Sequence, residues 1–442
     1  MSELKIPQGY KQTEVGVIPE DWGVYSLPDV IWYQEGPGLR NWQFKSKGLK
    51  VINVTNLQEN GWLDLDKTDR HISWSEFEKT YKHFACDNGD LVIASSGNSY
   101  CKASIVRECD LPLLMNTSVI RFKPIGIFSK GYMEVYLKSQ YFKNQIDLLI
   151  TGGAQPNFGP AHLNQIKIPA PIEEKEQTAI ATALSDTDAL ISELEKLISK
   201  KQAIKTATMQ QLLTGKTRLP QFSLRADGSK KGYKQSELGE IPEDWEVYLL
   251  SLICDVRDGT HDSPKYKDNG IPLVTSKNIV DDILDLSNVS LISPEDAFKI
   301  DKRSKVDKGD IIMSMIGTVG SAVLLLEDPE FCIKNVALFK PKKVLGEFLV
   351  QLIRSKNFQD YLEGSMDGGI QKFVSLGTLR NMEISLPSEQ EQIAIATILS
   401  DMDSEIQALE QRLVKTRQIK QGMMQELLTG KTRLVQPEAR GV

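Results

Sequence analysis

The 442-residue sequence predicts an internally duplicated α+β protein, in which an antiparallel coiled coil of two long helices separates two mixed α/β domains with pseudo-two-fold symmetry. Three observations lead to this prediction. The chain contains two long repeats, and each repeat ends in a stretch with helical periodicity. The segments between the repeats alternate short apolar runs with Gly, Asn and Asp turns.

The repeats are far apart in the chain. Residues 10–27 return at 233–250 with 13 of 18 positions identical, and residues 176–219 return at 391–434 with 26 of 44 identical. The offsets of 223 and 215 residues differ by eight, so the segments between the repeats differ in length by that amount. Solenoid repeats are much shorter, so this pattern indicates an ancestral domain that was duplicated and fused.

Each repeat ends in a predicted long helix, which begins after Pro171 in the first copy and with a capping box of Ser388 and Glu391 in the second. Apolar residues spaced three and four apart form a coiled-coil seam of about three heptads. The seam residues are Ile180, Leu184, Ile191, Leu194 and Ile198 in the first helix and Ile395, Leu399, Ile406, Leu409 and Leu413 in the second. We expect the two helices to pack on each other, each about 60 Å long at 1.5 Å per residue.

The eight residues LLTGKTRL close both predicted helices. Gly-Lys-Thr also ends a phosphate-binding loop, but that loop needs an additional glycine five residues earlier, where this chain has Gln210 and Gln425. We therefore interpret Gly215 and Gly430 as left-handed helix stops. The basic residues that follow are expected near the negative end of each helix dipole.

The segments between the repeats align only in patches, such as residues 89–97 with 309–317. Short apolar and β-branched runs predict strands, without evident parallel β-α-β alternation. The predicted strands include 91–94, 118–122, 272–275 and 310–313. The predicted domains are 1–173, helix 174–215, a linker with the second domain at 216–388, helix 389–430, and a tail at 431–442.

The composition, 40% hydrophobic and 25% charged, is typical of a soluble protein, and no run approaches the roughly 20 apolar residues that cross a bilayer. The first residues also lack the apolar region of a signal peptide. Five cysteines without CxxC spacing favour a reducing cytosol. His83, Cys86, Cys101 and Cys109 are an alternative zinc set, although buried thiols explain them more simply. The net charge of −6 argues only mildly against a nucleic-acid partner, because binding depends on where basic residues cluster.

Common catalytic signatures are absent from the sequence. It has no Asn/Asp-Pro-Pro-aromatic tetrapeptide, no glycine-rich nucleotide loop after a strand, and no G-x-S-x-G, HExxH or EF-hand pattern. Only Asp258-Gly-Thr-His261-Asp262 resembles a catalytic or metal cluster. The sequence therefore predicts a recognition protein with no catalytic residue, metal or cofactor of its own.

Taken together, these features resemble the specificity (S, HsdS) subunits of type I restriction-modification systems. The resemblance covers almost the whole chain. It rests on the divergent domains, the Ile-Pro-Glu-Asp-Trp segments at 18–22 and 241–245, the Glu-Gln-x-x-Ile-Ala segments at 176–181 and 391–396, and the two helices that end in LLTGKTRL.

The resemblance implies that each divergent domain is a target-recognition domain that reads one half of an asymmetric, bipartite sequence in double-stranded DNA. It implies that the helices set the gap and dock two modification (methyltransferase) subunits, which restriction subunits then join. S-adenosylmethionine, ATP and Mg would belong to those partners. The location would be the cytoplasm of a bacterium or archaeon.

Reading base edges requires Arg, Lys, Asn, Gln or Ser side chains on loops that reach a groove. The candidates are Asn98, Ser99, Tyr100, Lys102, Gln155 and Asn157 in the first domain, and His261, Ser263, Lys265, Lys267, Gln371 and Lys372 in the second. Two other functions stay open. One is a stand-alone methyltransferase or nuclease with degenerate motifs, and the other is a two-armed protein-interaction scaffold without a DNA role.

Overall fold

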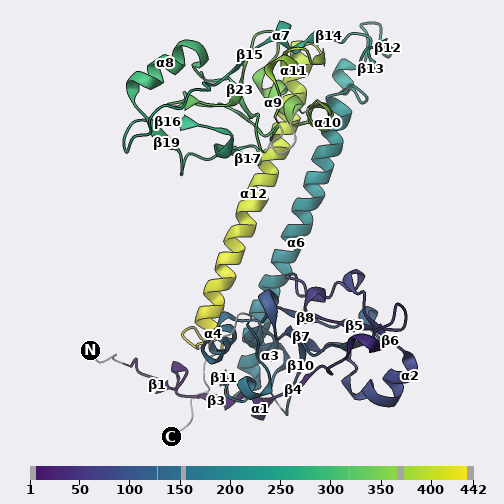
Figure 1. Ribbon diagram of the computed structural model, residues 1–442, viewed down its shortest axis with the longest axis vertical. Coiled ribbons are helices and arrows are strands. Elements are labelled where there is room, and N and C mark those ends of the chain that lie inside the picture. The colour runs from purple at the N-terminus through teal and green to yellow at the C-terminus, as the bar shows by residue number, and fades with distance from the viewer. Residues whose placement is uncertain (1–5, 127, 151–155, 318, 366–372, 436–442) are drawn as a thin grey trace. The chain divides into compact units, whose positions relative to one another are not determined.

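Two long helices and two sheet-based domains make up the fold (Figure 1). The computed structural model describes residues 6–126, 128–150, 156–317, 319–365 and 373–435. The long helices are α6, Glu174–Leu212, and α12, Glu389–Leu427, both of 39 residues. The chain divides into two compact units, the first formed by residues 1–195 and 411–442 and the second by 196–410. Each long helix therefore begins in one unit and ends in the other.

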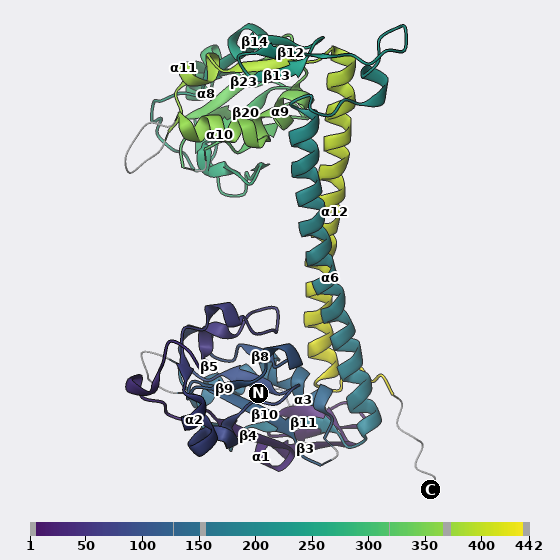
Figure 2. The same ribbon diagram turned by 90° about the vertical axis from the view of Figure 1, so that its right-hand side faces the viewer.

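In the first unit, the beginning of α6 pairs with the end of α12 (Figure 2). Arg417 donates a hydrogen bond to Glu195 at 2.6 Å, and Lys420 pairs with Asp188 at 2.5 Å. The residue that lies earlier in α6 therefore pairs with the residue that lies later in α12, as in two antiparallel helices. The predicted antiparallel pairing is thereby confirmed for this unit.

In the second unit, the end of α6 pairs with the beginning of α12 in the same sense. Gln202 donates a hydrogen bond to Glu410 at 3.3 Å, and Lys205, three residues later in α6, pairs with Asp403, which lies earlier in α12. Among the predicted seam residues, Ile180, Leu184, Leu194, Ile198, Ile395, Leu399 and Ile406 are buried, and Ile191, Leu409 and Leu413 are half-buried. The first two seam residues of each helix lie in the apolar core of their own domain, so these turns anchor the domain to its helix.

The first domain is built on a four-stranded antiparallel sheet of order β4-β10-β7-β8 and a smaller sheet of order β6-β5-β9. Its strands are β1 Tyr10–Thr13, β2 Gly16–Pro19, β3 Trp22–Ser26, β4 Ile31–Glu35, β5 Leu49–Ile52, β6 His71–Ile72, β7 Leu91–Ala94, β8 Ala103–Ile105, β9 Leu113–Met115, β10 Val119–Pro124 and β11 Lys167–Pro171. Its helices are α1 Leu27–Val30, α2 Trp74–Glu76, α3 Lys130–Leu137, α4 Gln140–Leu149 and α5 Pro160–Leu163.

The second domain repeats this plan with sheets of order β15-β23-β20-β21 and β19-β16-β22. Its strands are β12 Tyr233–Ser236, β13 Gly239–Pro242, β14 Glu246–Leu249, β15 Cys254–Asp258, β16 Ile271–Val274, β17 Ile279–Val280, β18 Ile283–Leu284, β19 Ser290–Ile292, β20 Ile311–Ser314, β21 Ala322–Leu324, β22 Cys332–Ile333, β23 Val336–Pro341 and β24 Glu383–Leu386. Its helices are α7 Leu250–Ile253, α8 Pro294–Ser304, α9 Gly346–Arg354, α10 Lys356–Gly364 and α11 Leu376–Arg380. The predicted duplicated α+β fold is confirmed. Among the described strands, β5–β9 and β16–β22 pair in parallel, which the sequence did not reveal.

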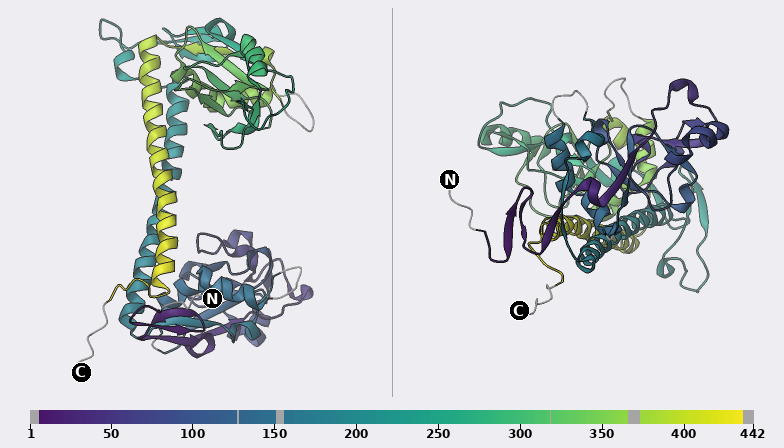
Figure 3. Two further views of the ribbon diagram at one scale, coloured as in Figure 1. Left: turned by 90° about the vertical axis from the view of Figure 1, so that its left-hand side faces the viewer. Right: turned by 90° about the horizontal axis from the view of Figure 1, so that it is seen from below.

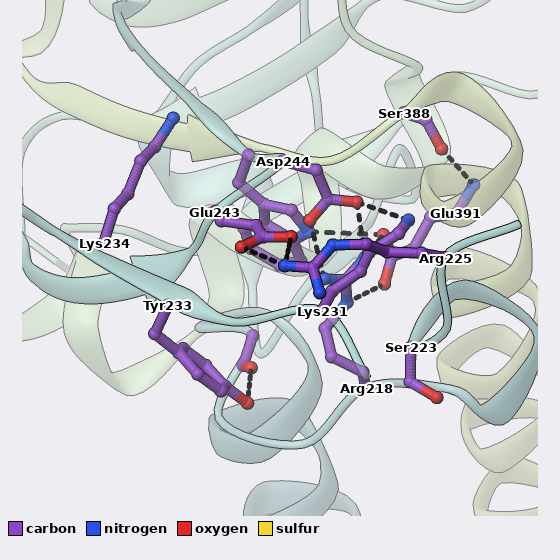
Figure 4. Close-up of polar contacts among 12 residues, drawn as sticks. Arg218, Ser223, Arg225, Lys231, Tyr233, Lys234, Glu243, Asp244, Ser388 and Glu391 are labelled. Atoms are coloured by element: carbon purple, nitrogen blue, oxygen red, sulfur yellow. Dashed lines mark hydrogen bonds and ion pairs between the residues drawn. The ribbon is translucent and has the colours of Figure 1, made fainter. Parts of the chain in front are cut away.

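In the second unit, an arginine latch joins the end of α6 to the start of α12 (Figure 4). The Arg218 guanidinium donates two hydrogen bonds to Glu391, both 2.7 Å, and two to Asp244, 2.7 and 3.1 Å. Burial raises the pKa of Asp244, but hydrogen bonds from Arg218 and Lys231 outweigh burial and lower that pKa to about 2. Asp244 therefore contributes stability that is lost as the pH falls from its ordinary pKa of 3.8 toward 2.

The first unit contains the equivalent latch at the other end of the chain. The Arg433 guanidinium donates to Glu176 at 2.5 and 2.7 Å and to Asp21 at 2.9 and 2.8 Å. Figure 3 shows the yellow end of α12 beside the purple strands of this domain. Arg433 and Arg218 follow a helix end, as expected, and each also forms specific ion pairs that the sequence did not reveal. The predicted capping box at Ser388 is only half formed. The Glu391 N–H donates to Ser388 Oγ, but the Glu391 carboxylate accepts hydrogen bonds from Arg218 instead of from the Ser388 N–H.

The glycine of LLTGKTRL has the predicted left-handed backbone, with φ +70° at Gly215 and +68° at Gly430. A Cβ atom at Gly430 would lie 2.4 Å from Cγ of Pro19. Gly430→Ala is therefore expected to lower the free energy of unfolding by about 2–4 kcal/mol, because it adds backbone strain and a clash. Urea unfolding followed by circular dichroism measures this change.

The matched control is Gly422→Ala, in the interior of α12, where an added Cβ meets no atom within 4 Å. That substitution is expected to stabilise the protein by about 0.5–1 kcal/mol, because alanine favours the helix. Two changes of the same sign would contradict the assignment of Gly430 to a close, left-handed turn.

Candidate nucleic-acid interface

In the first domain, two loops leave the same edge of the four-stranded sheet. Glu35 at the end of β4 lies opposite Ile120, and Ala94 at the end of β7 lies opposite Val119. The N–H of Gly36 donates to the Val119 carbonyl at 3.0 Å. The loops that follow β4 and β7 therefore flank the start of β10. We call residues 36–48, 95–102 and 116–118 the first loop edge.

The second domain has the corresponding edge. Asp258 at the end of β15 lies opposite Ala337, and Ser314 at the end of β20 lies opposite Val336. The N–H of Gly259 donates to the Val336 carbonyl at 3.0 Å, as the N–H of Gly36 does in the first domain. We call residues 259–270, 315–317 and 334–335 the second loop edge.

Loop 36–48 and loop 259–270 end in the same way. A Cβ at Gly48 would lie 2.1 Å from the Ile72 carbonyl oxygen, and one at Gly270 would lie 2.0 Å from that of Ile292. Three residues before each glycine, the backbone N–H of a lysine donates a hydrogen bond to a backbone carbonyl next to that glycine's neighbour. These bonds are Lys45 to the His71 carbonyl at 2.8 Å and Lys267 to the Leu291 carbonyl at 2.9 Å. The two loops are therefore equivalent, although their sequences differ.

Sequence reasoning selected the second of these loops and missed the first. The available signal was the pair of glycines, together with a lysine three residues before the last one, in both copies. Loop 36–48 contains Arg40, Lys45 and Lys47 and no acidic residue. All three basic residues are exposed, so this loop concentrates positive charge in a chain of net charge −6.

In the first domain, the structure brings some of the predicted residues together. Asn98 is exposed and Ser99 half-buried on a 3₁₀ turn after β7. Asn157 is exposed and forms a β-bridge with Ser96, which places it beside that turn. Gln155 lies outside the described residues.

Tyr100 and Lys102 instead have partners within their own domain. The Tyr100 hydroxyl donates to Asp147 at 2.6 Å and accepts from Lys143 at 2.6 Å. Lys102 pairs with Glu59 at 2.9 Å. Any contact that these two side chains make with a ligand would compete with those interactions.

In the second domain, His261 and Ser263 are held against residues 334 and 335. The His261 ring lies 2.7 Å from Asp258 Oδ2 and 2.8 Å from Asn335 Oδ1, and Lys334 donates to Ser263 Oγ at 2.7 Å. Asp258 is buried, and its other oxygen accepts from Arg303. This network holds the loop in place, and the described residues contain no group of three or more side chains that could hold a metal ion.

Lys265 and Lys267 are exposed on the same loop. Gln371 and Lys372 lie outside the described residues, although the neighbouring Phe373 forms a β-bridge with Ile316 of the second loop edge. Among the predicted residues of this domain that the structure describes, Lys265 and Lys267 are therefore exposed and have no hydrogen bond or ion pair from their side chains within the described part of the chain.

The cysteines do not form the alternative zinc set in the part of the chain that the structure describes. Burial raises the pKa values of Cys86 and Cys101 to about 12, so both remain neutral thiols. No described helix is long and apolar enough to cross a membrane.

Comparison with known proteins identifies one family. The family model described as "Type I restriction modification DNA specificity domain" matches residues 19–206 and 242–417. The chain is 26% identical over 441 residues to the type I restriction enzyme MjaVIII specificity subunit of Methanocaldococcus jannaschii, covering 97% of this chain and 96% of that protein. It is 27% identical over 253 residues to the EcoBI specificity subunit of Escherichia coli, covering 54% of this chain and 52% of the relative.

A solved structure has the same fold. The S subunit of a type I restriction-modification system from M. genitalium aligns with a TM-score of 0.57 and 15% sequence identity. The alignment covers 96% of this chain and 98% of that one. The likeness therefore extends through both domains and both long helices.

Proposed function

Because the chain belongs to the type I restriction-modification DNA specificity family, we propose that it is the non-catalytic subunit that selects the DNA target of such a complex. Each domain reads one half of an asymmetric, bipartite target through its loop edge. The long helices set the gap between the halves and dock two methyltransferase subunits. Restriction subunits complete the complex, and S-adenosylmethionine, ATP and Mg act in those partners, in the cytoplasm of a bacterium or archaeon.

The observation that carries this proposal is a repeated frame with two different loop edges. Both domains have the same order of strands in their sheets, the same arginine latch and the same backbone contacts at the ends of their loops. The residues inside the loops differ. A shared frame with different loops is what reading two different half-sequences requires, because base edges are distinguished by the side chains that face them. Identical loops would instead favour a symmetric target.

Apolar side chains on the long helices support the docking of protein partners. The helices expose Leu190, Leu197, Ile204, Ile393, Val414 and Ile419, each between 38% and 54% accessible. Exposed apolar side chains in a helical assembly commonly mark a protein interface when they cluster. We assign them to the two methyltransferase subunits.

The test is a map of methylated adenines in DNA from cells that express this chain with its cognate modification subunit. We expect a split, asymmetric motif that is methylated on both strands. Absence of new methylation, with both proteins soluble and associated, would contradict the proposal and favour an interaction scaffold without a DNA role.

The exposed lysines of the second loop edge provide a more local prediction. In Lys265→Ala/Lys267→Ala, we expect the slope of log affinity against log salt concentration to become shallower by about 2, because each phosphate contact releases about one counterion. Binding should weaken on every DNA sequence. Titration of labelled duplex with the complex at several salt concentrations measures both effects.

Lys342→Ala/Lys343→Ala is the matched control. Both lysines are exposed, and they follow the opposite end of β23 from the second loop edge. This double variant removes the same charge, so its salt slope should match that of the unmodified protein. Equal slopes for the two double variants would remove Lys265 and Lys267 from the interface.

A further inference from the structure

Trp42 is the most exposed tryptophan among the six in this chain, at 74% accessible surface. It lies on the first loop edge, in the 3₁₀ turn Asn41–Gln43. Within the described residues, its indole has no hydrogen bond or aromatic contact. A single exposed apolar side chain is ordinary on a protein surface, so its meaning depends on how it is held and what surrounds it.

The turn beneath Trp42 is held in place by the residue that follows it. Gln43 is only 4% exposed, and its side chain accepts from the Arg40 N–H at 2.8 Å and donates to the Tyr81 hydroxyl at 2.9 Å. It also donates to Glu76. The bond from Lys45 to the His71 carbonyl fixes the other side of the turn. An indole presented on such a fixed turn loses little conformational entropy on binding.

The surroundings of Trp42 favour nucleic acid over protein as the partner. Arg40 and Lys45 flank it in sequence, and the whole loop contains no acidic side chain. The neighbouring loop on the same edge carries the exposed amide of Asn98. Basic side chains that suit phosphates, an amide that suits base edges and an apolar ring therefore occur on loops that leave the same sheet edge.

We propose that Trp42 makes an apolar contact with the bases of the half-site that the first domain reads, and that it determines part of the specificity for that half. Aromatic side chains contact DNA by packing on a thymine methyl group or by inserting at a base step. This inference rests on the proposed function. It adds a residue and a contact type to one half of the target.

The second domain has no tryptophan at the equivalent step of its loop. Counting back three residues from Lys45 gives Trp42, and counting back three from the equivalent Lys267 gives Pro264. The second loop edge instead exposes Tyr266, one residue before Lys267, so an indole at the position of Trp42 belongs to the first domain alone. Its loss should affect one half-site only, and the other half-site serves as an internal reference.

The experiment compares Trp42→Ala and Trp42→Phe with the unmodified chain, each co-expressed with the modification subunit. Methylated adenines are mapped in the cellular DNA, and methylation rates are measured on duplexes in which one half of the target is altered. We expect Trp42→Ala to lower the rate on the intact target on the order of 10- to 100-fold and to reduce discrimination in the first half only. Trp42→Phe should retain most activity, because its ring can still pack on bases.

Trp62→Ala is the matched control, since Trp62 is a partly exposed tryptophan of the same domain that packs under Arg107 at 5.4 Å. It should leave both half-sites unchanged, and thermal unfolding should show that both alanine variants remain folded. Unchanged discrimination in both halves for Trp42→Ala overturns the proposal. Weaker binding of the modification subunit, with unchanged discrimination in the methylation that remains, also overturns it and assigns Trp42 to a protein interface. If the unmodified chain directs no methylation, the proposed function itself fails.

Discussion

Arg433→Ala is expected to lower the free energy of unfolding by about 3–5 kcal/mol, because it leaves a buried carboxylate without its partner. The Glu176 side chain is only 5% exposed and accepts two hydrogen bonds from Arg433. The same guanidinium also donates two bonds to Asp21. Arg433→Ala therefore removes the ion pairs that join the segment after α12 to the start of α6 and to the first domain. Urea unfolding monitored by circular dichroism measures the loss.

Arg218→Ala should have an effect of similar size in the second unit, since the Glu391 side chain is 2% exposed. Arg225→Ala is the control. Arg225 pairs with Glu243 at the surface, where the two side chains are 45% and 35% exposed, and such a pair contributes about 0–1 kcal/mol. If Arg433→Ala were no more destabilising than Arg225→Ala, the latch would not be a stabilising element.

The long helices could be predicted from sequence because their signal is local. Apolar spacing, an acidic first turn and a closing glycine all lie within the helix or next to it. The predicted starts at 174 and 389 agree with the structure, and the predicted ends at 215 and 430 exceed Leu212 and Leu427 by three residues. The reason is that Gly215 and Gly430 close a turn beyond the last helical residue, with the Gly215 N–H donating to the Leu212 carbonyl at 3.2 Å.

The latch could not be predicted in the same way. Arg218 and Glu391 are 173 residues apart, and Arg433 and Glu176 are 257 apart. Nothing local in LLTGKTRL distinguishes an arginine that binds two carboxylates from one that faces a helix dipole. Only the antiparallel pairing in each unit brings these residues together.

The candidate site was predicted in part for a related reason. Polar residues after a strand are visible in sequence, so Asn98, His261 and Lys265 could be selected as candidates. Loop 36–48 also carries polar residues, but strand register was needed to show that it shares an edge with Asn98. Tyr100 fits the pattern for base contact, yet its hydroxyl forms hydrogen bonds with Asp147 and Lys143. Sequence alone does not reveal these two hydrogen bonds.

Insertion of seven residues into both long helices is expected to lengthen the unread gap of the DNA target by about three base pairs. Each helix passes from one unit to the other, and seven residues add about 10 Å at 1.5 Å per residue. One base pair occupies about 3.4 Å of duplex. Insertion of one heptad after residue 195 in α6 and another after 410 in α12 also preserves the phase of the apolar seam.

The half-sequences at both ends of the target should remain unchanged, because the inserted residues lie outside both loop edges. Insertion of five residues at the same two points is the control. Five residues rotate the following helix by about 140°, so apolar side chains leave the seam and methylation should be lost through misassembly. Mapping methylated adenines distinguishes these results. A seven-residue variant that remains folded and active but methylates the original motif would show that the helices do not set the gap, and the spacing would then have to come from the partner subunits.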